Sequence, residues 1–189
     1  MRSDQQRWEG RYRDGIAESP AANALLIDHA HLLTSGRALD AAAGRGANSL
    51  FAGRHGYLVD AMDISLAAMT ELKARSREQG SPINPIVADL DYQPLPEGMY
   101  DLVMVFYFFA TGLLQPLARS LRSDGLLFYA TYNYRHRTLK PGFNAAYLVP
   151  AGGLRPFFPG LEILLDEPEA GENGAESRLI ARMPRNLSL

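Results

Sequence analysis

The residues best placed to do chemistry are three aspartates, each associated with an apolar, strand-like run. Asp40 precedes a glycine turn in ALDAAAGRGANSLFA, Asp63 ends VDAMD, and Asp89 lies near the end of VADLD. Ligands of open α/β sheets bind outside the carboxyl ends of the strands. The three carboxylates are therefore expected to line one crevice, where they accept hydrogen bonds from a ligand.

The glycine turn that follows Asp40 matches neither standard phosphate-binding pattern. A P-loop needs Lys and then Ser or Thr after its last glycine, whereas an Ala-Asn pair follows Gly46. The dinucleotide fingerprint has its first two glycines at Gly44 and Gly46, but Ser49 stands where the third belongs. A carboxylate at position 40 would also repel a pyrophosphate. The pattern indicates a cationic, amino-acid-bearing nucleoside as the ligand, not a phosphate-bearing one.

The other two aspartates have suitable positions for the rest of a nucleoside. A carboxylate at Asp63, 17 residues after Gly46, can accept hydrogen bonds from both ribose hydroxyls. Asp60 is expected on the opposite face, because side chains alternate along a strand. The third strand is expected to end in VADLD, so that Asp89 at its end can receive the exocyclic amine of an adenine.

The elements that must position these residues alternate between strands and helices. The alternation predicts parallel β-α-β units, and therefore an α/β, Rossmann-like, three-layer sandwich with a mostly parallel seven-stranded sheet that ends in an antiparallel hairpin. Ser19 and Ser65 are the expected helix N-caps, and Pro116 is expected in the first turn of its helix. Strands are predicted at 37–42, 57–63, 84–90, 100–108 and 126–133, and helices at 19–33, 47–56, 65–80 and 113–125.

The C-terminal part of the chain breaks this alternation. Its proline- and glycine-rich stretch predicts a short helix at 144–148 followed by an irregular lid. Two strand-like runs at 161–169 and 177–185, separated by a polar turn, predict an antiparallel hairpin. We expect one domain over 1–189, with a helical cap (1–36), a cofactor-binding core (37–133), a substrate-side segment (134–160) and the hairpin (161–189).

The composition of the chain limits its function. Among 189 residues, 47% are hydrophobic and 21% charged, and the net charge of −2 gives no electrostatic footprint for nucleic acid. The absence of cysteine excludes disulfides, thiolate metal sites and a cysteine nucleophile. No apolar run has the length of a membrane span, and the first residues are too polar for a secretory signal. A cytoplasmic protein with no nucleic-acid or membrane partner is expected, its oligomeric state being left open.

Four segments in this order and spacing, LDAAAGRGANS, VDAMDIS, VADLD and YDLVMVF, resemble the class I S-adenosylmethionine-dependent methyltransferases. The resemblance covers roughly residues 39–133, is closest to the tellurite-resistance-type and related small methyltransferases, and extends to the terminal hairpin. It implies S-adenosylmethionine as the cofactor, and RWEGRY resembles a segment that closes over it. The cofactor-binding residues implied are Asp40, Ala42, Gly44 and Gly46 for the methionine part, Asp63 for the ribose, Ile64, Asp89 and Leu90 for the adenine, Phe106 for the sulfonium, and Tyr12.

The sequence departs from the family pattern in two places. Ala42 and Ala43 stand where the family usually has Gly and often has Cys or Ser, and neither change removes a charge or a donor that the cofactor needs. The fourth strand lacks the Asn-Pro-Pro-Tyr or Asp-Pro-Pro-Tyr motif of methyltransferases that act on exocyclic amines of bases or on glutamine. DNA and glutamine are therefore disfavoured, and a small-molecule acceptor is expected.

The transfer itself would be a direct displacement in which the protein supplies proximity and alignment. An acceptor hydroxyl or protonated amine needs a general base, for which His136 is the candidate. Tyr107, at the end of the fourth strand, is expected to face the acceptor as a second catalytic candidate. A thiolate or a metalloid oxyanion needs no base. No metal site is expected. Two other classes stay open: a catalytically silent cofactor-binding module that acts through a protein partner, and an NAD-dependent oxidoreductase, which Asp40 and the missing third glycine disfavour.

Overall fold

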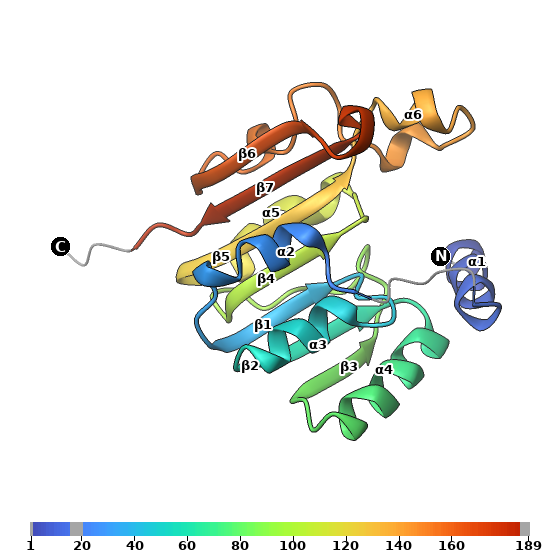
Figure 1. The fold of residues 1–189 in the computed structure, drawn as a ribbon, viewed down its shortest axis with the longest axis vertical. Helices are drawn as coiled ribbons and strands as arrows, with labels where there is room; N and C mark the ends of the chain where they lie inside the picture. Colours follow the sequence, from blue (N-terminus) through green and yellow to red (C-terminus); the bar gives the residue numbers. More distant parts are fainter. Residues whose placement is uncertain (1, 16–20, 186–189) are drawn as a thin grey trace. The chain divides into compact units, whose positions relative to one another are not determined.

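The computed structural model describes residues 2–15 and 21–185, in which seven strands form a mostly parallel sheet with an antiparallel hairpin (Figure 1). This confirms the predicted α/β, Rossmann-like fold class. The chain divides into two compact units, Met1–Pro94 and Leu95–Leu189, referred to below as unit 1 and unit 2. None of the described helices is both long enough and apolar enough to cross a membrane.

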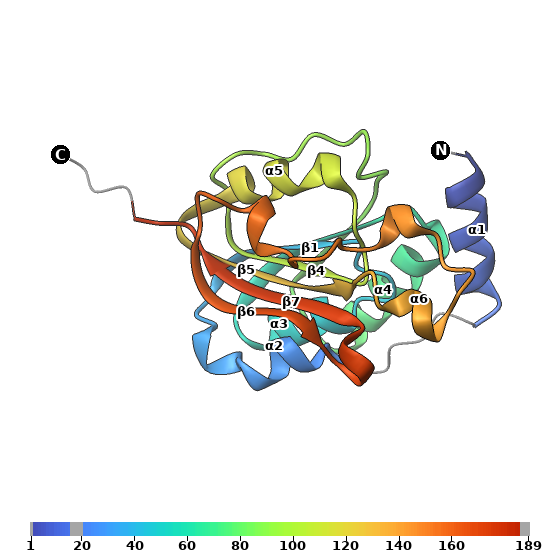
Figure 2. The same cartoon turned by 90° about the horizontal axis from the view of Figure 1, so that it is seen from above.

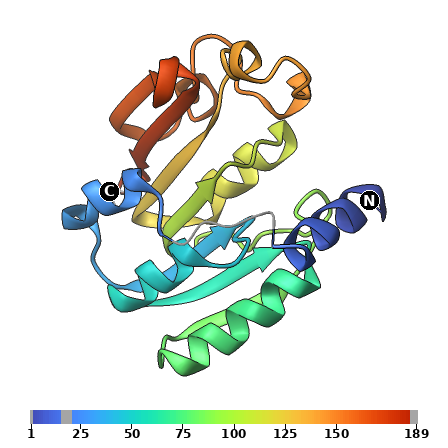
Figure 3. The same cartoon turned by 45° about the vertical axis from the view of Figure 1, so that its right-hand side comes forward.

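Unit 1 contains three parallel strands in the order β3-β2-β1. The register pairs Asp40 with Ala61 and Asp63 with Val87, so these carboxylates come from neighbouring strands near the same end. Two helices connect the strands, and α4 packs along β3 and β2 (Figure 3). The elements are α1 (Arg2–Arg13), α2 (Ala24–Asp28), η1 (Ala30–Leu32), β1 (Gly36–Ala41), α3 (Ala47–Arg54), β2 (Tyr57–Asp63), α4 (Leu66–Glu78) and β3 (Ile83–Val87).

Local capping explains where the helices of unit 1 begin. Ser65 is the N-cap of α4 as predicted, and its hydroxyl accepts the amide of Ala68 at 3.2 Å. The helix predicted from residue 19 instead begins at Ala24, because Asn23 accepts the amide of Leu25 at 2.9 Å. The expected cap Ser19 lies outside the described residues.

Unit 2 contains four strands in the order β4-β5-β7-β6, of which β4 and β5 are parallel and the hairpin is antiparallel, as predicted. Figure 2 shows α5 on one side of β4 and β5. The run 102–106 of β4 is buried throughout, which fits a strand covered on both faces. The elements are β4 (Tyr100–Phe106), α5 (Thr111–Ser120), β5 (Leu121–Tyr132), α6 (His136–Leu139), η2 (Ala145–Tyr147), η3 (Arg155–Phe157), β6 (Glu162–Ala170), η4 (Glu172–Gly174) and β7 (Glu176–Arg182).

The prediction of a helix over 113–125 is wrong at both ends. Helix α5 starts at Thr111, so Pro116 lies inside it, and not in its first turn. Residues 121–125 belong to β5, because Leu121 pairs with Tyr100 of β4 and backbone hydrogen bonds tie Asp124 and Gly125 to Met183, the residue after β7. The amide of Asp124 donates to the carbonyl of Met183 at 3.0 Å, and the amide of Met183 donates to the carbonyl of Gly125 at 2.8 Å. These long-range bonds override the local helical pattern.

Candidate functional site

The turn between β1 and α3 is built from left-handed backbone conformations. Its φ angles are 61° at Ala42, 54° at Gly44 and 74° at Gly46. A left-handed conformation costs a residue with a side chain roughly 1 kcal/mol, which glycine avoids. Ala42 therefore carries this strain at a position where a glycine would not. The sharp turn aims its amides toward the end of β2.

Asp63 holds the glycine turn against the end of β2. Its Oδ2 accepts the amide of Gly44 at 2.9 Å, and its Oδ1 accepts the amide of Ser65 at 2.9 Å. The side chain is buried, with 5% of the residue exposed. The amide of Ile64 also bonds this carboxylate. Since two carboxylate oxygens can accept about four hydrogen bonds, the carboxylate keeps acceptor capacity for a ligand hydroxyl.

Asp40 lies one residue before the end of β1 and is 1% exposed. Its Oδ2 accepts the hydroxyl of Ser49 at 2.6 Å. Ser49, which stands where a dinucleotide site has its third glycine, therefore fixes the orientation of the carboxylate.

The electrostatics of these two carboxylates set the site apart from an ordinary structural ion pair. Burial raises the pKa of Asp40 to about 7, against the hydroxyl of Ser49, and the charge of Asp63 raises it further. Burial also raises the pKa of Asp63, against its amide hydrogen bonds. Within residues 2–15 and 21–185, neither carboxylate forms a salt bridge. Two buried acids without a cation form a site that suits a positively charged ligand.

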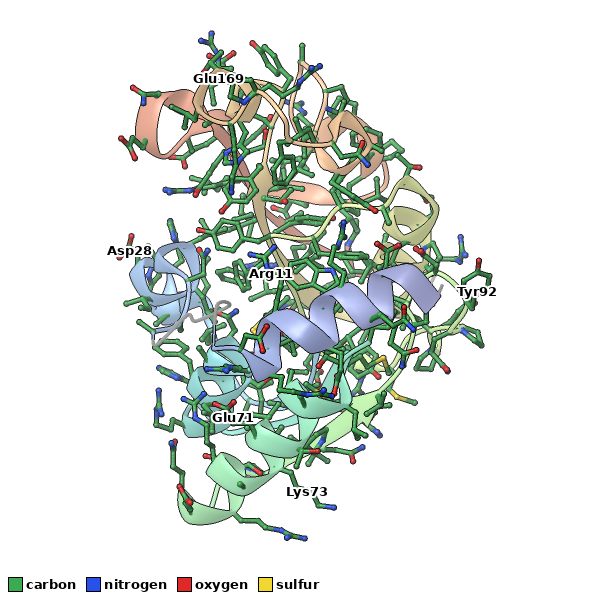
Figure 4. All side chains as sticks on the ribbon, turned by 90° about the vertical axis from the view of Figure 1, so that its right-hand side faces the viewer. Arg11, Asp28, Glu71, Lys73, Tyr92 and Glu169 are labelled. Atoms are coloured by element: carbon green, nitrogen blue, oxygen red, sulfur yellow. The ribbon has the colours of Figure 1, made fainter. Side chains whose placement is uncertain are left out.

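Tyr12 of α1 lies over the glycine turn. A Cβ at Gly44 would lie 2.7 Å from the Tyr12 hydroxyl, so glycine is needed there for close approach as well as for its φ. Burial and the nearby Asp63 carboxylate raise the pKa of Tyr12. The Arg45 guanidinium donates to the carbonyl of Tyr12 at 2.7 Å and pairs with Glu71 at 3.1 Å. Figure 4 labels Glu71 on α4 and shows α1 beside that helix.

Glu9 joins α1 to the N-terminus of α4. Its Oε2 accepts the hydroxyl of Ser65 at 2.6 Å and the amide of Ala67 at 3.1 Å. A carboxylate is favourable at this end of a helix, where amides are unpaired and the dipole is positive. The hydrogen bond from Ser65 is the main cause that lowers the pKa of Glu9. Through these hydrogen bonds, Glu9 and Arg45 hold the segment RWEGRY near the glycine turn.

The residues expected near an adenine lie after two different strands, β2 and β3. Ile64 is half-buried directly after β2. The expectation that the third strand ends at an aspartate is wrong, because β3 ends at Val87. Asp89 lies two residues later in a turn, where its Oδ1 accepts the amide of Asp91 at 3.1 Å. Leu90 is buried beside it.

The remaining predicted residues belong to unit 2. Phe106 is the last residue of β4 and is buried. Tyr107 follows with a φ of 56° and is 47% exposed. Its hydroxyl donates to Glu176 at 3.2 Å. A non-glycine residue in this conformation is strained, and such strain is concentrated at functional sites. His136 begins α6, and its ring stacks on that of Tyr132 with centroids 3.9 Å apart.

Segment 134–150 of unit 2 also borders a cavity of about 470 Å³. The volume lies within the range of small-molecule sites. Its lining is Tyr134, Arg137, Ala145, Leu148, Val149 and Pro150. Among the described residues, no cluster of three or more His, Asp or Glu side chains suits a metal ion.

Three residues that contribute to these arrangements were not predicted from the sequence. Ser49 was taken only as a missing glycine, although a hydroxyl in the first turn of α3 can reach back to the strand. Glu9 precedes Tyr12 by three residues, a spacing that places both on one side of a helix. Glu176 had no local signal, because its contact with Tyr107 spans 69 residues.

Comparisons with known proteins agree with this geometry. Residues 38–125 match the family model described as a methyltransferase domain. No curated protein matches the chain. TehB from Haemophilus influenzae has a similar structure, with a TM-score of 0.74 and 16% identity over 93% of this chain and 67% of that one.

Two further structures are similar. One is a structure described under the conversion of a disulfide bond into a thioacetal group during echinomycin biosynthesis. Its TM-score is 0.73, with 19% identity over 98% of this chain and 94% of that one. The other is geranyl diphosphate C-methyltransferase from Streptomyces coelicolor A3(2), in complex with Mg2+, geranyl diphosphate and S-adenosyl-L-homocysteine. Its TM-score is 0.66, with 15% identity over 85% of this chain and 79% of that one. Residues 38–125 thus match a methyltransferase domain, and the chain has the fold of these solved structures.

Proposed function

We propose that the protein binds S-adenosylmethionine and transfers its methyl group to a small-molecule acceptor. The observation that carries this proposal is the pair of buried carboxylates, Asp40 and Asp63, for which the described residues provide no salt bridge. A ligand with an ammonium and a sulfonium group supplies the missing positive charge. A dinucleotide would instead bring two phosphates toward these acids.

The cofactor-binding residues follow from the geometry of unit 1. Asp40 would accept the ammonium group, and the free acceptor sites of Asp63 would take the ribose hydroxyls. Tyr12 would cover the methionine part together with the turn that contains Ala42, Gly44 and Gly46. For the adenine we propose Ile64, Asp89 and Leu90. Phe106 of unit 2 would contribute at the sulfonium. The bound cofactor supplies an activated methyl group, so the chain has to orient the reactants and exclude water.

Unit 2 would hold the acceptor. Tyr107 and His136 are the proposed catalytic residues, since the strained backbone of Tyr107 fixes its phenol and the imidazole of His136 can take a proton. The geranyl diphosphate C-methyltransferase is named for a small-molecule substrate, and the cavity of about 470 Å³ beside α6 lies in the size range of small-molecule sites. We further propose that the chain works as one methyltransferase domain in the cytoplasm.

A methylation assay tests this proposal against the silent-module alternative. The purified chain is incubated with S-adenosylmethionine and a panel of aromatic hydroxyl, thiol and amine compounds, and S-adenosylhomocysteine is measured by mass spectrometry. Acceptor-dependent formation of S-adenosylhomocysteine supports the enzyme. Cofactor binding with no turnover over the whole panel supports the silent module. A nucleoside that copurifies and is identified by mass would name the cofactor directly.

A further inference from the structure

Tyr107, Tyr132, His136 and Phe143 form one group of packed rings in unit 2, called here the acceptor cluster. The ring planes of Tyr132 and His136 are 22° apart at a centroid distance of 3.9 Å. Tyr107 lies 5.0 Å from Tyr132, and Phe143 meets His136 edge-on at 4.9 Å. Because Tyr107 is 47% exposed, the cluster presents aromatic surface on which another flat ring can pack.

Glu176 is held in place under this cluster by several contacts. Its Oε1 accepts the Tyr107 hydroxyl at 3.2 Å, and its Oε2 accepts two hydrogen bonds from Arg178 at 3.2 and 3.0 Å. Asn133, which is fully buried, donates to its carbonyl at 2.9 Å. A Cβ at Gly171 would lie 3.0 Å from its Cδ, so the turn closes tightly on the carboxylate. Glu176 is therefore preorganised, and Arg178 compensates its charge.

The imidazole of His136 is the base within this cluster. Its Nδ1 is buried and makes no hydrogen bond within the part of the chain that the structure describes. Burial is the main cause that lowers the pKa of His136, and the nearby Lys140 lowers it further, against Glu176. The ring is therefore neutral at pH 7 and can accept a proton.

We propose that the acceptor cluster binds an uncharged aromatic ring that carries a hydroxyl group, with Glu176 as the positioning residue for Tyr107. This inference rests on the proposed methyl transfer. The hydroxyl oxygen forms the bond to the methyl carbon, and the methyl–sulfur bond breaks with its electron pair staying on sulfur. The hydroxyl proton passes to His136. S-adenosylhomocysteine, a methyl ether and a protonated imidazole are formed.

The paired charge of Glu176 and the neutral base His136 favour an aromatic hydroxyl acceptor over cationic, thiolate and anionic acceptors. A cationic acceptor would need an uncompensated carboxylate, whereas Glu176 is paired with Arg178. A thiolate is already a nucleophile, so its methylation would not need His136 as a general base. An anionic acceptor would suit the cavity beside α6, because Arg137 is part of its lining. That rival binds at the cavity and not on the acceptor cluster.

Four nitrobenzenes that differ only in their para substituent test the inference. 4-Nitrophenol, 4-nitroanisole, 4-nitrobenzoate and 4-nitrophenyltrimethylammonium are titrated into the intact chain saturated with S-adenosylhomocysteine at pH 6. We expect 4-nitrophenol to bind at least about tenfold more tightly than the benzoate and the ammonium compound, since burying an unpaired charge is costly. Bound 4-nitrophenol should keep the spectrum of the neutral phenol, because the lowered pKa of His136 leaves the proton on the phenol until the methyl group is transferred.

Variants separate the roles of the residues. His136→Gln should keep 4-nitrophenol binding and slow its methylation by S-adenosylmethionine at pH 6 about 100-fold, the size typical of a lost general base. Glu176→Gln should weaken binding about tenfold, the size expected when a charged hydrogen bond is lost. Glu169→Gln is the matched control, because Glu169 also accepts a phenol, that of Tyr134 at 2.7 Å, and pairs with Arg135 at 2.9 Å. This second triad is exposed, and the control should behave as the unchanged chain. Figure 4 labels Glu169 on the hairpin.

Failure of this inference can be distinguished from failure of the proposed function. Calorimetry with S-adenosylhomocysteine on the same samples reports the cofactor site of unit 1. Intact cofactor binding with the benzoate or the ammonium compound as the tightest ligand would overturn the inference. So would intact cofactor binding without saturable 4-nitrophenol binding, or a methylation rate of 4-nitrophenol that is unchanged in His136→Gln. Loss of cofactor binding in the unchanged chain would contradict the proposed function itself.

Discussion

The amide of Gly44 donates to the Oδ2 of Asp63 over 2.9 Å, which ties the glycine turn after β1 to the end of β2. The same carboxylate accepts the amide of Ser65, which caps α4. One buried side chain therefore sets the position of two segments that would surround the ligand. Its remaining acceptor sites point to a role in binding as well as in folding.

Asp63→Asn should weaken S-adenosylhomocysteine binding by about 10- to 100-fold, because hydrogen bonds to a charged group contribute roughly 1.5–3 kcal/mol. Asp60→Asn is the matched control on the same strand, since Asp60 pairs with Arg37 at 2.8 Å and accepts from Asn84 at 3.1 Å. It should lower stability and leave the dissociation constant unchanged. Calorimetry well below the unfolding temperature gives both values. Equal affinity losses in the two variants would refute a specific role for Asp63.

Asp40 should couple cofactor binding to the release of a proton. Its pKa of about 7 means that Asp40 is mostly protonated below pH 7, while an ammonium group binds best to the ionised form. Affinity should therefore rise with pH up to about 7 and level off above it, with proton release near pH 6. Titration in two buffers of different ionisation enthalpy measures the release. Asp40→Asn should abolish it, and release that persists in this variant would exclude Asp40 as its source.

Asp40 also makes a prediction for the ligand-free protein. A carboxyl whose folded-state pKa is raised binds more protons in the folded than in the unfolded chain, between pH 3.8 and about 7. Its contribution to the free energy of unfolding is therefore present at low pH and decreases as pH rises, by up to about 1.4 kcal/mol per pH unit. Urea unfolding at pH 5 and pH 7 should show this slope as the difference between the unchanged chain and Asp40→Asn. Parallel pH profiles would contradict the raised pKa.

Gly46→Ala should destabilise the fold by about 2–4 kcal/mol, the sum of left-handed strain and overpacking. A Cβ at this position would collide with both methyl groups of Leu72, and φ is 74°. Gly80→Ala has a similar φ of 60° with nothing within 4 Å of the added Cβ, so it should cost about 1 kcal/mol. Urea unfolding of both variants measures the difference. Losses of equal size would argue against the close contact of the turn with α4.

Glu9→Gln should loosen α1 and speed the dissociation of S-adenosylhomocysteine. The change removes the charge that accepts hydrogen bonds at the N-terminus of α4. Because the pKa of Glu9 is lowered, its contribution is present above pH 4.5 and is lost as pH falls through the lowered value. Hydrogen exchange of residues 2–15 should become faster. Asp4→Asn is the control, since the ion pair of Asp4 is with Arg7 of the same helix, at 3.1 Å. Unchanged exchange in Glu9→Gln would rule out the contact.

The order of strands and helices could be predicted from the sequence because local signals were strong. Buried runs such as that of β4, the cap at Ser65 and the glycine turn each act over a few residues. The predictions failed where distant backbone bonds decide, as at Asp124, which pairs with Met183 and not with a helical neighbour. In the candidate site, the acids of unit 1 were visible from their spacing. The contact of Glu176 with Tyr107 was not, since no periodicity links residues so far apart.

The most direct test of the account is a calorimetric titration of the purified chain with S-adenosylhomocysteine, S-adenosylmethionine and NADH. We predict one site for each of the first two ligands with a dissociation constant on the order of 1–10 μM, which corresponds to about 7–8 kcal/mol of binding free energy, and no saturable heat with NADH. Absence of binding by both S-adenosyl compounds, or tight saturable binding of NADH, would contradict the claim that Asp40 and Asp63 form a site for a cationic nucleoside.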